Sequence, residues 1–350
     1  MISESQIIEK LNSLFSGDEW IIHRKYLRKI KDHQSFINAN IIATLDNCNI
    51  NNRELLSNIS KAKNKLRDYQ IDHLTFHWPF KDDLSKISNA PLLSRLNFLS
   101  ISPDADCTSL NQIVLQDKHY TSKIIEELDY YRVDNRRIRL PRFQSGLPTT
   151  EGTFLTWFPT KTEFKKPNFE TIDIAVDSNI LWFLGKFNLL NVSGSEETIR
   201  FIKDILRRDL IITDSFRLSQ YYPNPIIILY IISRAIHWGN IKKLFSQRDN
   251  ILRLSKRLKP STPFDSLLLS SIGLYWDDYN LIEINIDGLK KSVRQTAPFY
   301  IAPLLSWLGT RIYPFFSIAK LEFTHMKFES LALQLAILLW FVQNHQKSRT

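Results

Sequence analysis

Apolar residues recur at helical spacing along almost the whole chain, and this feature constrains the fold most. Apolar positions at i, i+3, i+4 and i+7 form one face of a helix, whereas a strand shows alternation. The helical spacing covers nine segments: 7–15, 36–45, 55–69, 110–128, 176–190, 197–206, 226–236, 264–275 and 328–341. The chain has 9 glycines, and most of its 14 prolines fall between these segments, as helix stops do. The sequence therefore predicts an all-α fold.

Four of these helical segments resemble one another. They are FINANIIATL (36–45), VDSNILWFL (176–184), FDSLLLSSIGL (264–274) and FESLALQLAILL (328–339), and each continues from a polar or small opening into an apolar helix. Helical pairs that stack at intervals of about 40 to 50 residues form a solenoid, or a ring when the array closes. We therefore expect residues 1–350 to form a single helical toroid domain, with an ordinary helical bundle as the alternative.

Composition limits the compartment and the partners. Hydrophobic residues make up 43% of the 350 residues, which suffices for a packed core. The two cysteines, Cys48 and Cys107, give no disulfide framework, and the amino terminus lacks a signal-peptide pattern. The longest apolar runs, 226–232 and 331–342, are shorter than the roughly 18 to 20 residues of a membrane span. We expect a cytoplasmic protein, with peripheral membrane contact left open. The net charge of +10 is spread along the chain, which does not favour a nucleic-acid partner.

The stretch PDADCTSLNQ (103–112) places two carboxyl groups and a cysteine directly before an apolar segment. From Asp104 to Thr108 it resembles the acid motif of class II terpenoid cyclases, which is Asp-x-Asp-Asp followed by Thr, or Asp-Cys-Thr in the epoxide-opening sterol cyclases. The aromatic-rich stretches HLTFHWPF (73–80) and GTFLTWF (152–158) suit the same superfamily, which includes the protein prenyltransferases. The resemblance implies a single (α/α)6-type toroid.

The same resemblance implies a class II-like cyclase that protonates an alkene or epoxide of an apolar isoprenoid-type small molecule and cyclises it. Asp106 would be the general acid, Asp104 would tune and hold it, and Cys107 would replace the last Asp or the hydrogen-bonding Cys of the motif. This chemistry requires a carboxylic acid that stays protonated and is well aimed. Aromatic faces would stabilise the cation by about 1 to 2 kcal/mol each. The candidates are Trp78, Trp157, Trp182 and Tyr222.

Other interpretations of the acid motif stay open. An Asp that follows Pro at a helix start is a common N-cap, because its side chain accepts a backbone N–H and its charge suits the helix dipole. Full class II cyclases are also much longer and build their cavity between two barrels. The chain would then be a single-barrel relative with a small substrate, a member that a partner completes, or a toroid without catalysis. A noncatalytic helical scaffold that binds a protein or an anionic surface is the alternative function.

Arginines gather in YRVDNRRIRLPRF (131–143). Guanidinium groups bind phosphate oxygens in bidentate fashion, so Arg136 and Arg137 are candidates for contact with a diphosphate or an anionic surface. A solvated loop that pairs with nearby carboxylates is the alternative. No cofactor or metal is predicted, with Mg²⁺ an option if the substrate is a diphosphate.

A zinc-dependent prenyl-transfer relative is a further alternative, since that branch holds zinc with Asp, Cys and His. However, Asp106 and Cys107 are adjacent rather than spaced by one residue. His73 and His77 are four residues apart, but Pro79 interrupts the segment and no third ligand is obvious. We interpret these two histidines as structural.

Overall fold

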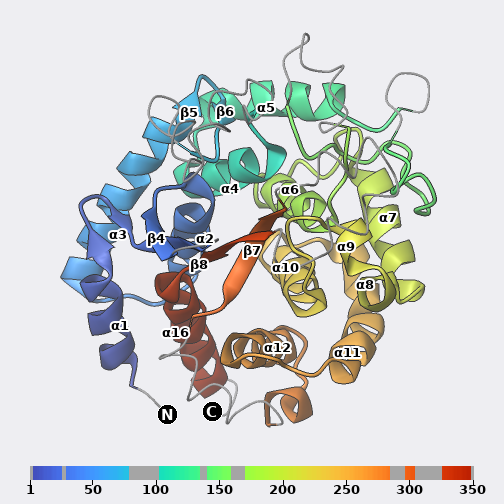
Figure 1. Cartoon of the computed structure of the whole chain (residues 1–350). Helices are drawn as coiled ribbons and strands as arrows, with labels where there is room; N and C mark the ends of the chain where they lie inside the picture. Colours follow the sequence, from blue (N-terminus) through green and yellow to red (C-terminus); the bar gives the residue numbers. More distant parts are fainter. Residues whose placement is uncertain are drawn as a thin grey trace.

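The computed structural model describes residues 3–25, 29–78, 102–134, 140–158, 170–283, 296–303 and 325–347. Six helices form a closed ring at its centre (Figure 1). They are α2 (Ser35–Leu45), α4 (Ala105–Leu115), α6 (Ile174–Lys186), α10 (Pro225–Trp238), α12 (Pro263–Tyr275) and α16 (Leu331–Lys347). Each helix contacts the next one along the chain, and α16 contacts α2, which closes the ring.

Further helices cover the outside of the ring. They are α1 (Glu4–Ser13), α3 (Arg53–Leu66), α5 (Lys118–Tyr130), α7 (Ser195–Arg207) and α11 (Arg248–Arg257), with short helical turns at η1 (Arg67–Tyr69), α8 (Leu210–Thr213), α9 (Ser215–Leu218) and η3 (Lys242–Gln247). α3 packs on α2, α5 on α4, α7 on α6 and α1 on α16. The outer helix α7 buries one apolar stripe and exposes Glu196 and Arg200. The inner helix α10, by contrast, is buried from Ile226 to Ile236, as a helix enclosed on all sides must be.

Two inner helices, α6 and α10, approach each other at a pair of glycines. A Cβ atom on Gly185 would lie 2.0 Å from the backbone oxygen of Gly239, so only glycine permits this packing. The approach brings Asn179 of α6 within hydrogen-bond distance of Arg234 of α10.

Polar residues cap the inner helices at their starts. Asp104, Asp173 and Asn224 accept backbone N–H groups from the first turns of α4, α6 and α10, and Thr262 forms a capping box at α12. Residues at the starts of α2, α4, α6 and α10 line one cavity, so these starts lie at the same end of the ring. We call this end the mouth of the ring.

A small antiparallel sheet accompanies the ring, and Figure 1 shows β7 and β8 crossing its centre. The order of its strands is β4 (Lys29–Asp32), β3 (Ile22–Lys25), β8 (His325–Glu329) and β7 (Pro298–Pro303). Two further two-stranded sheets are separate from it: β1 (Phe15–Ser16) with β2 (Glu19–Trp20), and β5 (Gln70–Ile71) with β6 (Leu74–Thr75). Phe328 lies opposite Tyr300 on one side and opposite Arg24 on the other, so the three side chains share a face. The prediction of a mainly helical chain is confirmed. The all-α class is too narrow, because the chain also contains this sheet, which was not predicted.

The helix boundaries differ from the predicted ones at one instructive place. Residues 110–128 were expected as one helix, but Gln116 has a left-handed backbone with φ of 52° that ends α4. Asp117 then caps the start of α5. In the part of the chain that the structure describes, no helix combines the length and the apolar character that a membrane crossing requires.

Candidate active site

A largely apolar cavity lies at the mouth of the ring. Its volume is about 90 Å³. The described lining combines aromatic rings with the acid motif and consists of Phe36, His77, Trp78, Asp104, Asp106, Cys107, Thr156, Trp157, Val176, Tyr221, Tyr222, Tyr300, Ile301 and Phe328. Small molecules bind in concave, mostly apolar sites that contain a few well-placed polar groups, as this one does.

Asp104 is the N-cap of α4. Its backbone is extended, and its Oδ1 accepts the backbone N–H of Cys107 at 2.5 Å. The backbone of the 153–158 segment runs alongside, with the N–H of Ala105 donating to the carbonyl of Thr156 at 2.9 Å, and this pairing places Trp157 beside the motif. The capping interpretation is therefore correct for Asp104.

Asp106 does not cap the helix. Its side chain meets two donors from other elements: Asn179 Nδ2 lies 2.7 Å from Oδ1, and the Tyr222 hydroxyl lies 2.5 Å from Oδ2. Asp106 is 5% exposed and lines the cavity. The two carboxyl groups of the motif thus differ: Asp104 caps the helix, and Asp106 is buried and hydrogen-bonded from two sides.

A buried guanidinium group lies behind Asp106. Arg234 is fully buried, and its Nη2 donates to Asn179 Oδ1 at 2.9 Å while its Nη1 donates to Asn40 Oδ1 at 2.7 Å. The guanidinium carbon also lies 4.7 Å from the ring centre of Trp182. Hydrogen bonds and a cation–π contact therefore hold a full positive charge one side chain away from Asp106.

The loop before α10 positions Tyr222. The Ser219 hydroxyl accepts the backbone N–H of Tyr222 at 3.0 Å and donates to Asp173 Oδ2 at 2.7 Å. Asp173 is itself fixed as the N-cap of α6. The tyrosine that contacts Asp106 is thus anchored to the helix that also supplies Asn179.

Burial dominates the electrostatics of the acidic groups. It raises the pKa of Asp106 to about 6, although the hydrogen bonds from Tyr222 and Asn179 and the charge of Arg234 lower it. Burial and the neighbouring Asp106 charge together raise the pKa of Asp104 to about 7. Burial likewise raises the pKa of Asp173 to about 7. Asp106 therefore holds its proton below about pH 6, and Asp104 and Asp173 hold theirs below about pH 7.

Cys107 belongs to a second hydrogen-bonded chain at the cavity. Burial lowers the pKa of His77 to about 3, so its ring is neutral. Tyr300 donates to Gln34 Oε1, and the Tyr300 hydroxyl lies 2.7 Å from His77 Nε2, so it accepts the N–H of that ring. His77 Nδ1 is then left as an acceptor, 3.7 Å from Cys107 Sγ. Burial and the nearby Asp104 charge raise the pKa of the Cys107 thiol, which therefore serves as a donor and not as a nucleophile.

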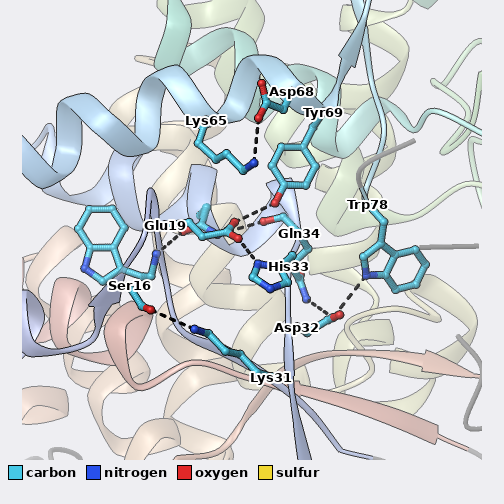
Figure 2. Close-up of polar contacts among 12 residues, drawn as sticks. Ser16, Glu19, Lys31, Asp32, His33, Gln34, Lys65, Asp68, Tyr69 and Trp78 are labelled. Atoms are coloured by element: carbon cyan, nitrogen blue, oxygen red, sulfur yellow. Dashed lines mark hydrogen bonds and ion pairs between the residues drawn. The ribbon is translucent and has the colours of Figure 1, made fainter. Parts of the chain in front are cut away.

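Polar groups behind the cavity wall orient Trp78. Figure 2 shows Asp32 Oδ2 between two donors, the indole Nε1 of Trp78 at 3.4 Å and Gln34 Nε2 at 3.1 Å. In the same cluster Glu19 accepts the hydroxyl of Tyr69 at 2.8 Å (Figure 2). Gln34 thus connects the hydrogen bonds at Trp78, through Asp32, with those at His77, through Tyr300.

Aromatic rings form much of the cavity wall. Tyr300 and Phe328 stack with ring centres 4.4 Å apart and planes 5° apart, as their direct pairing across β7 and β8 allows. Phe36 meets Tyr300 edge to face at 5.1 Å, and Trp157 meets Tyr221 at 5.8 Å. These rings present π-faces and edges around the space next to Asp106.

The structure brings together most of the residues that the sequence analysis singled out. The cavity lining includes Asp104, Asp106, Cys107, Trp78, Trp157 and Tyr222. Trp182 does not line it, because its side chain is buried between inner helices against Arg234. Arg136 and Arg137 lie outside the described residues.

The sequence analysis missed Asn179, Arg234, Tyr300 and the cavity role of His77. A signal existed for Arg234, since it is the only charged residue in the mainly apolar stretch 226–236. An arginine in such a place must be paired when it is buried. His73, in contrast, pairs with Asp72 at 2.7 Å and with Glu127 at 3.2 Å, away from His77.

Across the described residues, no group of three or more His, Cys, Asp and Glu side chains could hold a metal ion.

Comparisons with known proteins show that the fold of this chain is similar to that of solved structures. No protein-family model matches the sequence, and no curated protein matches it. Among solved structures, the chain is similar to a protein from Actinoplanes, with a TM-score of 0.61 and 11% identity over 99% of this chain and 100% of that one. It is also similar to the type II terpene cyclase MstE from Scytonema in complex with its substrate, geranylgeranyl dihydroxybenzoate. That likeness has a TM-score of 0.58 and 10% identity over 98% of this chain and 97% of that one.

The product complex of MstE with merosterolic acid A is similar at a TM-score of 0.54, with 10% identity over 97% of this chain and 96% of that one. The fold of the present chain is therefore cyclase-like. Length does not separate it from MstE, because the match spans nearly all of both chains.

Proposed function

We propose that this protein is a class II-like terpenoid cyclase built on a single (α/α)6-type toroid. Its substrate would be an apolar isoprenoid-type molecule with an alkene or epoxide to protonate. One observation carries the proposal: the Asp106 carboxyl group is buried, has its pKa raised to about 6, and lines an aromatic cavity. The likeness of the fold to a type II terpene cyclase supports it.

The proposed reaction begins with proton transfer from Asp106. With an alkene, the acid proton forms a new C–H bond and leaves a cation on the adjacent carbon; with an epoxide, it binds the oxygen as the C–O bond breaks. The π-electrons of the next alkene then close a ring, and the last cation loses a proton from a neighbouring carbon, so the net change is an isomerisation. The Asp106 carboxylate that remains accepts hydrogen bonds from Asn179 and Tyr222.

The other lining residues have supporting roles in this proposal. Asp104 holds the first turn of α4 and keeps its own proton near neutral pH. The rings of Trp78, Trp157 and Tyr300 would face the cation and stabilise it by about 1 to 2 kcal/mol each. Cys107 stays a protonated donor in place of a further carboxyl group.

The test is a turnover assay in deuterated water. The purified full chain is incubated with polyprenyl alcohols, polyprenyl-substituted aromatic acids, polyprenyl epoxides and polyprenyl diphosphates, and the products are analysed by mass spectrometry. Protonation of an alkene places one solvent deuterium in a C–D bond of the cyclic product, and protonation of an epoxide gives a cyclic alcohol, whereas an ionisation reaction releases diphosphate. Asp106→Asn is expected to lower the rate by about 10³-fold or more. The control is Asp249→Asn, at a residue whose side chain is 94% exposed.

The two alternatives predict other results in the same experiment. A zinc-dependent prenyl-transfer relative would contain zinc by elemental analysis and would release diphosphate. A noncatalytic scaffold would give no cyclic product from any of these substrates and would show no saturable binding of them at the cavity. Mg²⁺ dependence is expected only if a diphosphate proves to be the substrate. A cytoplasmic location and peripheral membrane contact stay predictions, which fractionation of cells that produce the protein would check.

A further inference from the structure

The Asn179 side chain lies between a guanidinium group and the acid. Arg234 Nη2 is 2.9 Å from Asn179 Oδ1, and Asn179 Nδ2 is 2.7 Å from Asp106 Oδ1. Arginine has donors only, so it must face the carbonyl end of the amide. The NH₂ end of Asn179 therefore always faces Asp106.

Arg234 itself cannot turn away from this arrangement. It is fully buried, its Nη1 is bound to Asn40 Oδ1 at 2.7 Å, and its guanidinium group lies against Trp182. Helices α2, α6 and α10 each contribute one of these side chains or more. A buried arginine that lost these acceptors would be strongly unfavourable, so the orientation is fixed by the core of the ring.

This orientation decides which oxygen of Asp106 carries the proton. Oδ1 faces a permanent N–H donor and cannot hold a hydrogen there, whereas Oδ2 faces the hydroxyl of Tyr222, which both donates and accepts. We infer that Arg234, acting through Asn179, holds the proton of Asp106 on Oδ2, the oxygen next to cavity-lining Tyr222. Both are then positioning residues for the acid, a role that rests on the proposed function.

The transfer balances without a further reactant. Oδ2 gives up its proton to the substrate, and Tyr222 then turns its own O–H toward Oδ2 while Asn179 continues to donate to Oδ1. The carboxylate is stabilised at both oxygens, and the Arg234 charge behind Asn179 adds to this effect. The other titratable groups that act in this region are Asp104, Asp173, Cys107 and Tyr222, and none of them carries a positive charge.

Infrared difference spectroscopy tests this placement of the proton. The spectrum of the full chain minus that of Asp106→Asn, recorded as a function of pH, isolates the carboxylic C=O stretch of Asp106. With the proton on Oδ2, the carbonyl oxygen is Oδ1 and its stretch is lowered by the Asn179 bond. Asn179→Ala is therefore expected to shift the band to higher frequency, and Arg234→Gln to raise the titration midpoint of Asp106 by about 1.

Two further variants serve as controls. Asn111→Ala removes an equally buried inner-helix amide, bound to Thr75 instead, and is expected to move neither the band nor the midpoint. Arg234→Lys keeps the charge, so the titration midpoint of Asp106 in this variant is expected to lie closer to the wild-type value than to that of Arg234→Gln. If Arg234→Gln does not fold, Arg234→Lys is compared with the wild type alone. An unmoved band in Asn179→Ala, or a midpoint in Arg234→Lys as high as in Arg234→Gln, overturns the inference.

The infrared results do not depend on turnover. If they are as expected but no substrate is cyclised, the proposed function fails while the assignment of the proton stands. If a substrate is cyclised, Asn179→Ala is expected to lower kcat by about 10²-fold with KM unchanged, because it acts on the acid and not on binding.

Discussion

Replacement of Asp106 by Asn is expected to stabilise the protein at high pH while it removes the acid. Asparagine reproduces the neutral acid: its carbonyl can accept from Asn179 and its NH₂ can donate to the Tyr222 oxygen. Asn179 and Tyr222 therefore each keep a hydrogen-bond partner at position 106. The variant therefore removes a burial cost and adds none of comparable size.

The magnitude follows from the pKa of Asp106. Burial raises that pKa from its ordinary value of 3.8 to about 6, a difference of about 2, and at about 1.4 kcal/mol per pKa unit this is about 3 kcal/mol. Because the folded protein binds the proton more tightly than the unfolded chain, the wild type loses stability as pH rises from about 4 to about 6. The gain in the free energy of unfolding from Asp106→Asn is then about 3 kcal/mol near pH 8 and about 1 kcal/mol near pH 4.5.

Urea unfolding at several pH values measures this gain, and thermal unfolding near pH 8 should show a rise in Tm of about 4 °C for a chain of 350 residues. Asp249→Asn, which alters an exposed carboxylate, should change the free energy of unfolding by less than about 0.5 kcal/mol at every pH. A variant at position 106 that is less stable than the wild type near pH 8, or whose effect is the same at both pH values, would refute the reasoning.

Three further results are expected. With a turned-over substrate, kcat/KM should fall about tenfold per pH unit above about pH 6, since only the protonated Asp106 reacts; a rate that rises with pH would contradict this role. Gly185→Ala should lower the free energy of unfolding by about 3 kcal/mol or more, because its Cβ would lie 2.0 Å from a backbone oxygen, whereas Gly17→Ala, with no atom within 4 Å, should cost only about 1 kcal/mol. Phe328→Leu, which removes a ring from the cavity wall, should lower kcat by about 5- to 30-fold and broaden the products, while Tyr300→Phe, which keeps its ring, should lower it less.

The helices are the part of the structure that sequence alone could predict. Helical spacing depends on neighbouring residues, so each predicted segment contains or overlaps a helix of the structure. The boundary at Gln116 was missed because a left-handed backbone at a non-glycine residue leaves no clear mark in the sequence. The segment 298–303, with a proline at each end, has no alternation to mark it as the strand β7.

The partners of Asp106 could not be predicted in the same way. Asn179 and Tyr222 lie 73 and 116 residues from Asp106 along the chain, and Arg234 lies 55 residues from Asn179. The packing of α6 between α4 and α10 brings these residues together, and no local pattern in the sequence specifies that register. Trp182 shows the converse, since a tryptophan with suitable neighbours in sequence proved to pack on Arg234 and not at the cavity.

The proposed reaction would explain why an N-cap and a buried carboxyl group occur two residues apart. A carboxyl group that protonates carbon must be neutral before the reaction, yet its conjugate base must be stabilised when the proton leaves. Burial satisfies the first condition by raising the pKa of Asp106 to about 6. The second is met by groups that favour the charged form: the Asn179 and Tyr222 bonds, the Arg234 charge, and the positive end of α4, whose first turn Asp104 holds in place. A surface cap would meet only the second condition and an acid in an apolar core only the first, so the helix start inside the ring is the position that meets both.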